Sequence, residues 1–218
     1  MVSFLKILLA FAIYAGIHSL LLTRSARLAL EALFGQRLFR RWFRLCYSIQ
    51  AAVLFLVFLV YAAVQPDIEL LVFYGQLVWL LYGLRLLGLG ILVWSLWAVG
   101  FTTFLGIDYW RAGKHHELPA GDGIDAPEFT IRGPYRWVRH PMYSGGFLLL
   151  WALPYWTLNI LAFNLAATTY LWLAVRHEEA RLVEAFGDKY RAYQATTPRF
   201  FPRFGTTGGT RRGRVRGA

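Results

Sequence analysis

The sequence predicts an all-α integral membrane protein with about five transmembrane segments, the last two forming a tight helical hairpin. Three observations predict this class. Hydrophobic residues make up 57% of the 218 residues and the mean hydropathy is +0.44, values typical of multi-span membrane proteins. Apolar runs long enough to cross a bilayer recur along the chain. The basic residues, which give a net charge of +11, gather in the segments between alternate runs.

The N-terminal part predicts one span followed by a basic helix at the membrane surface. We expect the first span at roughly Phe4–Leu22, retained rather than cleaved as a signal peptide. His18 near its end is either a functional group or a helix-end histidine bonded to a carbonyl, and the sequence leaves both readings open. The basic segment Thr23–Arg44 predicts an interfacial helix with a break near Gly35.

Two further spans are expected at roughly Leu45–Val64 and Phe73–Val99. Arg85 lies near the middle of the third span, so its side chain should face the bundle interior or reach toward the interface. The same span carries three glycines that permit close helix packing, namely Gly83, Gly88 and Gly90.

The apolar run Phe147–Val175 has 29 residues, about 43 Å as one helix, which is too long for an untilted crossing. Pro154 and Asn159 interrupt it near the centre. We therefore predict a helical hairpin of segments 145–154 and 158–175, with one long tilted helix as the alternative. Beyond it, residues 176–186 predict a helix lying on the membrane that ends at Gly187.

The chain is expected to form a single membrane domain, residues 1–204, followed by a disordered basic tail, residues 205–218. Of the 23 Lys and Arg residues, 21 fall on one side of a five-segment arrangement. The positive-inside rule then places the loop 100–143 and the C-terminus in the cytoplasm, with a bacterial inner membrane as the expected location. This charge predicts anionic lipid as a partner rather than nucleic acid. The sequence makes no prediction about oligomeric state.

Two weaker signals concern metals and disulfides. Cys46 is the only cysteine, so it forms no internal disulfide, and we expect it to be a packing residue. The run His115-His116-Glu117 lacks a helical ligand spacing, so we expect a solvated loop and no metal site.

The segment Arg132–Gly146 is the strongest candidate for a ligand-binding loop. It combines four basic side chains with two X-Pro corners and two tyrosines directly before an apolar run. A basic juxtamembrane anchor is the plainer alternative. The carboxylate pair Glu178-Glu179 follows about 40 residues later on the same predicted face. Carboxylates bind an ammonium group or ribose hydroxyls and tyrosines pack on a ring or a sulfonium, so a cytosolic ligand with cationic and adenine-like parts fits.

The loop and the segment that begins at this pair together form a two-part motif. It reads Gly133-Pro-Tyr-Arg-Trp-Val-Arg-His-Pro-Met-Tyr-Ser-Gly145 and then Glu178-Glu179-x-x-Leu182-x-x-x-Phe186-Gly187-x-x-Tyr190-x-x-Tyr193-x-x-x-x-Pro198-Arg199-Phe200. This motif resembles the isoprenylcysteine carboxyl methyltransferase superfamily, which also holds phospholipid N-methyltransferases and bacterial methanethiol S-methyltransferases. The N-terminal half is loosely similar to the methanethiol S-methyltransferase and NnrU-like branch, through His18-Ser19, Arg40–Tyr47 and Phe104-Leu105-Gly106.

The resemblance implies S-adenosylmethionine as methyl donor, bound by the part of the chain at roughly residues 127–202. It assigns a set of residues to the cofactor: Phe129, Thr130, Tyr135, His140, Pro141, Met142, Tyr143, Glu178 and Glu179. Arg139 and Arg176 are the catalytic candidates, because nearby cations favour a thiolate and an arginine near the last span serves a substrate carboxylate in the carboxyl methyltransferases.

The activity that the resemblance implies is methyl transfer to a small, methanethiol-like thiol or to another acceptor that arrives from the bilayer or the cytosol. An isoprenylcysteine carboxyl O-methyltransferase and a phospholipid N-methyltransferase are the alternatives within this chemistry. An NADPH-dependent sterol reductase is less favoured: it carries a similar Arg-His-Pro-x-Tyr loop but is normally much larger. A non-enzymatic membrane scaffold explains the charge and hydropathy but not the two spaced motifs.

Overall fold

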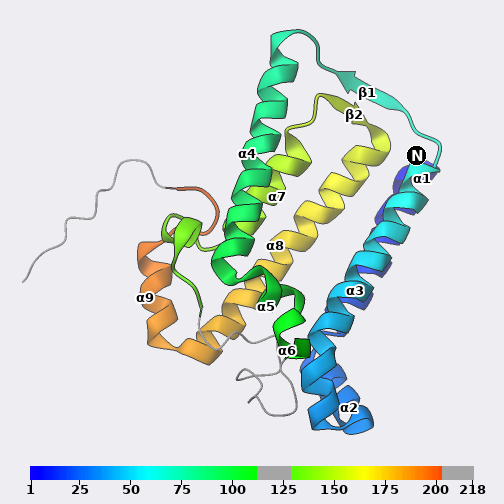
Figure 1. The fold of residues 1–218 in the computed structure, drawn as a ribbon. Coiled ribbons are helices and arrows are strands. Elements are labelled where there is room, and N and C mark those ends of the chain that lie inside the picture. Colours follow the sequence, from blue (N-terminus) through cyan, green and yellow to red (C-terminus); the bar gives the residue numbers. More distant parts are fainter. Residues whose placement is uncertain (112–128, 203–218) are drawn as a thin grey trace, which may run out of the picture.

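The computed structural model describes residues 1–111 and 129–202, and this part of the chain is mostly helical (Figure 1). The chain is an all-α integral membrane protein, as predicted. Its helices are α1 Val2–Leu20, α2 Arg24–Phe34, α3 Gln36–Ala63, α4 Gln76–Val99, α5 Phe101–Leu105, α6 Ile107–Arg111, the 3-10 helix η1 Gly133–Arg136, α7 Pro141–Trp151, α8 Leu158–Phe186 and α9 Asp188–Thr196. Two short strands, β1 Glu69–Val72 and β2 Tyr155–Thr157, pair antiparallel. The predicted tail 205–218 and the His115-His116-Glu117 run lie outside the described residues.

Four helices of the described part are long and apolar enough to cross a membrane, namely α1, α3, α4 and α8. Their outer surfaces carry many exposed large apolar side chains, including Leu9, Leu56 and Leu86, as lipid contact requires. α7 has 11 residues, about 16 Å of helix, against the roughly 30 Å of a bilayer core. It is therefore shorter than the fifth full span that the sequence predicted.

Residues 147–175 do not form one long helix, because α7 ends at Trp151 and α8 begins at Leu158. The interfacial helix predicted at 176–186 is wrong as a separate element. These residues are the last three turns of α8, which continues unbroken until Gly187, a glycine with φ of +53°. The reason is local: the chain from Leu158 to Phe186 contains neither proline nor glycine, so nothing interrupts the helix where the apolar run gives way to charge.

At the break before Pro154, a side chain from the neighbouring helix satisfies the backbone carbonyl that has lost its donor. Proline has no backbone N–H, so the carbonyl of Leu150 loses the donor that would continue α7. The side-chain amide of Asn164 on α8 donates to this carbonyl instead, and Asn164 is fully buried. The polar group inside the bundle is thus satisfied, and it fixes α8 against the end of α7.

The predicted basic segment Thr23–Arg44 has the predicted break, but its second half differs from the prediction. α2 starts after Thr23, whose hydroxyl accepts from the N–H of Ala26, and it ends at Gly35, where φ is +80°. Residues 36–44 then belong to α3, which runs on into the second span. Only the first half is therefore a helix separate from the spans.

α4 and α7 cross in close contact because two glycines face each other. A Cβ atom added to Gly88 would lie 2.8 Å from the carbonyl oxygen of Gly145, and one added to Gly145 would lie 2.5 Å from that of Gly88. Of the glycines expected to allow close packing in α4, Gly83 and Gly90 have open space beside them. The close approach fixes α7, and with it the loop that precedes α7, against a spanning helix.

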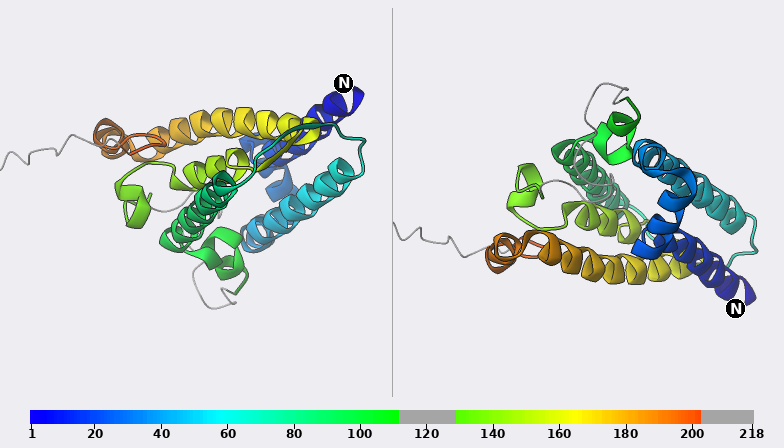
Figure 2. Two further views of the ribbon diagram at one scale, coloured as in Figure 1. Left: turned by 90° about the horizontal axis from the view of Figure 1, so that it is seen from above. Right: turned by 90° about the horizontal axis from the view of Figure 1, so that it is seen from below.

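The other half of the bundle is held by an aromatic cluster between α1, α3 and α8. Phe11 packs edge-on against Phe58 and Phe163, with ring centroids 5.4 Å and 5.7 Å apart, and Ile7 and Ala162 are fully buried beside them. Figure 1 shows α2, α5, α6 and α9 toward the end of the long helices that is far from β1 and β2, with α1 largely hidden behind α3. The two views of Figure 2 show the same arrangement from above and below.

Candidate active site

The structure joins the two parts of the motif by backbone pairing. The N–H of Arg139 donates to the carbonyl of Pro198 at 2.9 Å, and the N–H of His140 donates to that of Arg199 at 3.0 Å. The hydroxyl of Ser144, in the first turn of α7, donates to the carbonyl of Phe200 at 2.6 Å. Segments almost 60 residues apart in the sequence therefore lie edge to edge, and together they form one end of the site.

Glu179 is the centre of this junction. Its side chain is 6% exposed, and Arg139 and His140 approach one carboxylate oxygen, at 2.8 Å and 3.1 Å. The other oxygen accepts from Arg199 at 2.6 Å and from Gln194 at 3.3 Å. We call Glu179 and these four partners the carboxylate hub. It ties the loop, α8, α9 and the segment after α9 to one another.

Glu178 has a different environment, although it is the next residue. Successive helix positions differ by about 100°, so its side chain leaves α8 in another direction. One carboxylate oxygen accepts from the hydroxyl of Tyr143 at 3.0 Å and lies 3.6 Å from Nδ1 of His140. The side chain is 34% exposed, against 6% for Glu179. Glu178 is therefore the member of the pair that a ligand can reach.

Burial controls the protonation of the groups around these carboxylates. Desolvation lowers the pKa of His140 below its usual value near 6.5, although the carboxylates of Glu178 and Glu179 oppose this shift. His140 is therefore neutral at neutral pH, and its contact with Glu179 is a hydrogen bond rather than an ion pair. Burial likewise raises the pKa of Tyr193 to about 12 and raises that of Tyr135. The hydroxyl of Tyr193 donates to the carbonyl of Tyr135.

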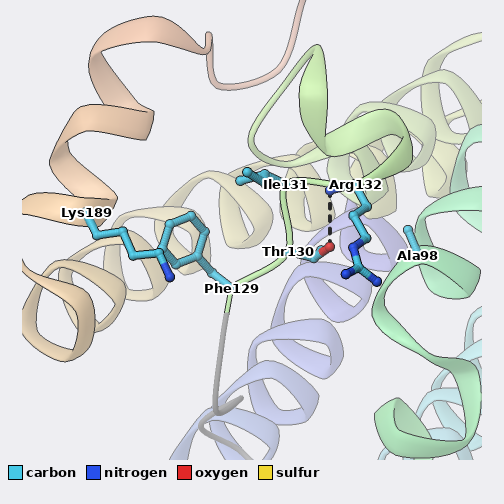
Figure 3. Close-up of a pocket in the computed structure, with 6 residues that line it drawn as sticks. All are labelled: Ala98, Phe129, Thr130, Ile131, Arg132 and Lys189. Atoms are coloured by element: carbon cyan, nitrogen blue, oxygen red, sulfur yellow. Dashed lines mark hydrogen bonds between the residues drawn. The ribbon is translucent and has the colours of Figure 1, made fainter.

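A pocket of about 450 Å³ opens between the end of α4, the segment before η1 and the start of α9 (Figure 3). Phe129 and Lys189 lie on one side of it, and Ala98 and Arg132 lie on the other. The ring of Phe129 packs against three aromatic side chains, those of Phe186, Tyr190 and Tyr193, with centroids 5.1–5.5 Å away. The ammonium group of Lys189 lies 5.6 Å from the Phe129 ring centroid. The pocket thus combines an aromatic wall with positive charge.

The site residues expected from the sequence fall into three groups. Glu178, Tyr143 and His140 converge, since Glu178 contacts the other two, and Tyr135 in η1 is held by the hydroxyl of Tyr193. Phe129 and Thr130 line the neighbouring pocket. The remaining members of the set lie within these elements: buried Pro141 is the first residue of α7, half-buried Met142 follows it, and Glu179 lies in the hub.

The two arginines proposed for catalysis occupy other environments. Each side-chain nitrogen of Arg139 has a partner in the hub or at the carbonyls of Gln194 and Thr197, and the side chain is 10% exposed. Arg176 is exposed, and its guanidinium carbon lies 3.6 Å from the ring centroid of Trp172 on the outside of α8. Two helix positions separate Arg176 from Glu178, about 200° of rotation, so the two side chains point to nearly opposite faces.

Sequence reasoning assigned no individual role to four residues that build this region. Arg199 and Gln194 complete the carboxylate hub, while Arg132 and Lys189 line the pocket. Two of them had a signal, because Arg199 is part of the two-part motif and Arg132 is a basic residue of the candidate loop. Gln194 and Lys189 had none, because only the fold of α9 back onto the loop brings them there.

This arrangement offers a ligand-accessible carboxylate beside a tyrosine hydroxyl, and a separate pocket with the Phe129 ring in its wall. A carboxylate held this way binds cationic nitrogen or paired hydroxyls, and an aromatic wall stacks on a heterocycle or a sulfonium. The pocket volume lies within the range of small-ligand sites, roughly 300–1,000 Å³. The neighbouring hub fixes both parts before any ligand arrives.

Known proteins with similar sequences agree with this chemistry. The chain is 33% identical over 132 residues to methanethiol S-methyltransferase 2 of Bradyrhizobium diazoefficiens, covering 59% of this chain and 48% of that protein. It is 36% identical over 114 residues to methanethiol S-methyltransferase of Pseudomonas deceptionensis, covering 51% and 44%. The Mycobacterium tuberculosis protein of that name is 33% identical over 114 residues, with 51% and 47% covered.

The chain spans about half the length of these curated relatives. No solved structure matches. The sequence pattern of the phospholipid methyltransferase family matches residues 77–189, just over half of the chain, from α4 to the start of α9. This confirms the resemblance that the two-part motif indicated: the chain belongs to the phospholipid methyltransferase family.

Proposed function

We propose that this protein is an S-adenosylmethionine-dependent methyltransferase whose acceptor is a small thiol. The observation that carries the proposal is the partly exposed Glu178 carboxylate, which accepts a hydrogen bond from Tyr143. The thiol acceptor is supported by the relatives, three of which are named methanethiol S-methyltransferases and are 33–36% identical over the matched part.

The residues of the site fit the proposed donor. S-adenosylmethionine carries an ammonium group, ribose hydroxyls and an adenine ring, and its methyl group is attached to a sulfonium that is already a good leaving group. We assign Glu178 and Tyr143 to its polar end, because this carboxylate is the partly exposed one of the pair. Phe129 and Thr130 would take the adenine, since an aromatic wall is the surface on which a heterocycle stacks.

The chain itself would position the reactants and exclude water from the site. The hub holds the loop, α8 and α9 in one geometry. For a reaction with a good leaving group, orienting the two reactants is the main way to increase the rate. We assign Arg139 a positioning role in this hub, because its nitrogen atoms are already paired. Arg176, stacked on Trp172 away from Glu178, would instead anchor α8 at the membrane surface.

We place the site on the cytoplasmic side of a bacterial inner membrane. The 21 basic residues that gather between alternate spans support this orientation through the positive-inside rule. They also support contact with anionic lipid at the same face. The acceptor would then enter from the bilayer or from the cytosol.

Isothermal titration of the detergent-purified protein with S-adenosylhomocysteine, repeated with NADPH, tests the donor. We expect saturable binding of S-adenosylhomocysteine alone. Glu178→Gln and Tyr143→Phe should each weaken that binding at least tenfold, whereas Glu184→Gln, an exposed carboxylate on the same helix, should not. Binding of NADPH alone would support a reductase, and unchanged affinity in both site variants would place the donor elsewhere.

A second candidate is N-methylation of an ethanolamine phospholipid, which the name of the matching family favours. Labelled S-adenosylmethionine separates the two: methanethiol should accept the label and yield dimethyl sulfide, and phosphatidylethanolamine vesicles should not. Label in the lipid without label in the sulfide would reverse this assignment.

A further inference from the structure

A second polar cluster lies at the C-terminal end of α1, apart from the motif. The hydroxyl of Tyr47 on α3 lies 2.7 Å from Nε2 and 3.2 Å from Nδ1 of His18 on α1. Tyr170 on α8 completes the group: its hydroxyl lies 3.2 Å from that of Ser19, and its ring centroid lies 6.2 Å from that of His18. Tyr14 stands next to the histidine, with ring centroids 5.7 Å apart.

This cluster opens toward its surroundings rather than being sealed in the core. Ser19 is exposed, and His18, Tyr47 and Tyr170 are half-buried. Packing alone would favour apolar side chains here, as in the Phe11 cluster one to two turns away on α1. An ionisable side chain inside a membrane helix is therefore a functional candidate.

The cluster adjoins the proposed donor site. Tyr170 and Glu178 are eight positions apart on α8, roughly 12 Å along the axis, and their directions differ by about 80°. α7 lies beside both parts of α8: the hydroxyl of Tyr143 bonds Glu178, and a Cβ atom added to Gly146, three residues later on α7, would lie 4.0 Å from Leu171, the neighbour of Tyr170. Both polar sites therefore border α8, about two helix turns apart.

Resting on the proposed function, we infer that His18 and Tyr47 form the proton-accepting pair of the acceptor site, and that the tyrosines around them bind the thiol. A thiol is a poor nucleophile until it loses its proton. Among the described residues near Glu178, the guanidinium of Arg139 is paired with Glu179 and stays protonated, so it is no base. The second ring nitrogen of His140, Nδ1, lies 3.6 Å from the Glu178 carboxylate, which we assign to the donor rather than to the acceptor. The aromatic rings beside His18 suit a small sulfur compound, because sulfur packs well against ring edges.

In the proposed step one S–H bond and one C–S bond break, and one S–C bond forms. The S–H bond of the acceptor breaks, and its electron pair stays on sulfur and forms the new S–CH₃ bond. The C–S bond of the donor sulfonium breaks, and its pair stays on the donor sulfur, which becomes a neutral thioether. The thiol proton passes to the hydroxyl oxygen of Tyr47 while the proton of that hydroxyl passes to Nε2 of His18, the nearer ring nitrogen.

The test compares two acceptors that differ in acidity. Methanethiol must lose a proton during transfer, whereas methaneselenol is ionised at neutral pH. Full-length His18→Gln and Tyr47→Phe proteins are assayed with both acceptors, with Tyr61→Phe, a lipid-facing tyrosine of the same helix, as the control. Binding of S-adenosylhomocysteine, measured by titration, reports that each variant is folded and keeps its donor site.

We expect His18→Gln to lower turnover of methanethiol about 100-fold, the usual scale of lost acid–base catalysis, and that of methaneselenol by less than about threefold. Tyr47→Phe should show the same acceptor-dependent loss, and all variants should keep donor affinity. Equal losses with both acceptors, or no loss with either, would overturn the inference while leaving the methyltransferase assignment in place. Failure of the wild-type protein to bind S-adenosylhomocysteine would remove both.

Discussion

Replacing Glu179 with alanine should destabilise the protein far more than any other single carboxylate removal in the described part of α8. The substitution leaves the guanidinium of Arg139, which is 10% exposed, without its main counter-charge. Removing one partner from a buried pair costs about 3–5 kcal/mol. Arg199 is 39% exposed, so its share is below about 1 kcal/mol because water screens it. Glu179→Gln keeps the packing and one acceptor, so it should cost roughly 1–3 kcal/mol.

The assay is thermal unfolding in detergent, followed by tryptophan fluorescence. For a chain of this size each kcal/mol lowers the midpoint by about 2–4 °C, so Glu179→Ala should lower it by roughly 6–20 °C. Glu184→Ala, exposed on the same helix, should stay within about 2 °C. Glu178→Ala should resemble this control in stability while losing donor affinity. A wild-type midpoint for Glu179→Ala would refute the hub as a stabilising element.

Three further predictions follow from the packing and the buried polar groups. Gly88→Ala should lower the unfolding midpoint by the equivalent of about 1–3 kcal/mol, because its new methyl group meets the backbone of α7, whereas Gly83→Ala should be neutral. Asn164→Leu should cost about 1–3 kcal/mol, measured the same way, because the carbonyl of Leu150 loses its donor. The pKa of His140 is lower in the folded protein than in the unfolded chain, so below pH 6.5 the unfolded chain binds the proton first. The free energy of unfolding of the wild-type protein should therefore fall by up to about 1.4 kcal/mol per pH unit until the folded-state pKa is reached. His140→Gln should reduce this slope, and unfolding midpoints measured between pH 7 and 5 test this.

Much of the architecture could be predicted because membrane insertion leaves clear marks in a sequence. The apolar runs predicted most of the ends of α1, α3, α4 and α8 to within a few residues. This was possible because each helix must supply enough apolar length to cross a bilayer. Errors occurred where polarity changed inside a continuous helix. Residues 36–44 and 176–186 were expected at the membrane surface as separate elements, but neither segment has an internal breaker, so the helices run straight through them.

The site could be predicted only as far as its motif reaches. Tyr143 and Glu178 were expected together, and the structure places their oxygens 3.0 Å apart. Helix spacing predicts that Glu178 and Glu179 point in different directions, but the partners of each followed from no residue pattern. They depend on α9 folding back so that Gln194 and Arg199 reach one carboxylate and leave its neighbour open.

The proposed division between donor and acceptor sites follows the extent of the family match. The matched region, residues 77–189, contains Glu178 and Tyr143, which we assign to the methyl donor, and most of the hub. His18 and Tyr47 precede this region, on α1 and α3. The contacts of Glu179 hold the loop in place, and any movement of the loop would break them. The loop can therefore change little to accommodate a different acceptor. Acceptor choice within the family should therefore depend on the helices that pack against the matched region, and His18→Gln tests this for the present chain.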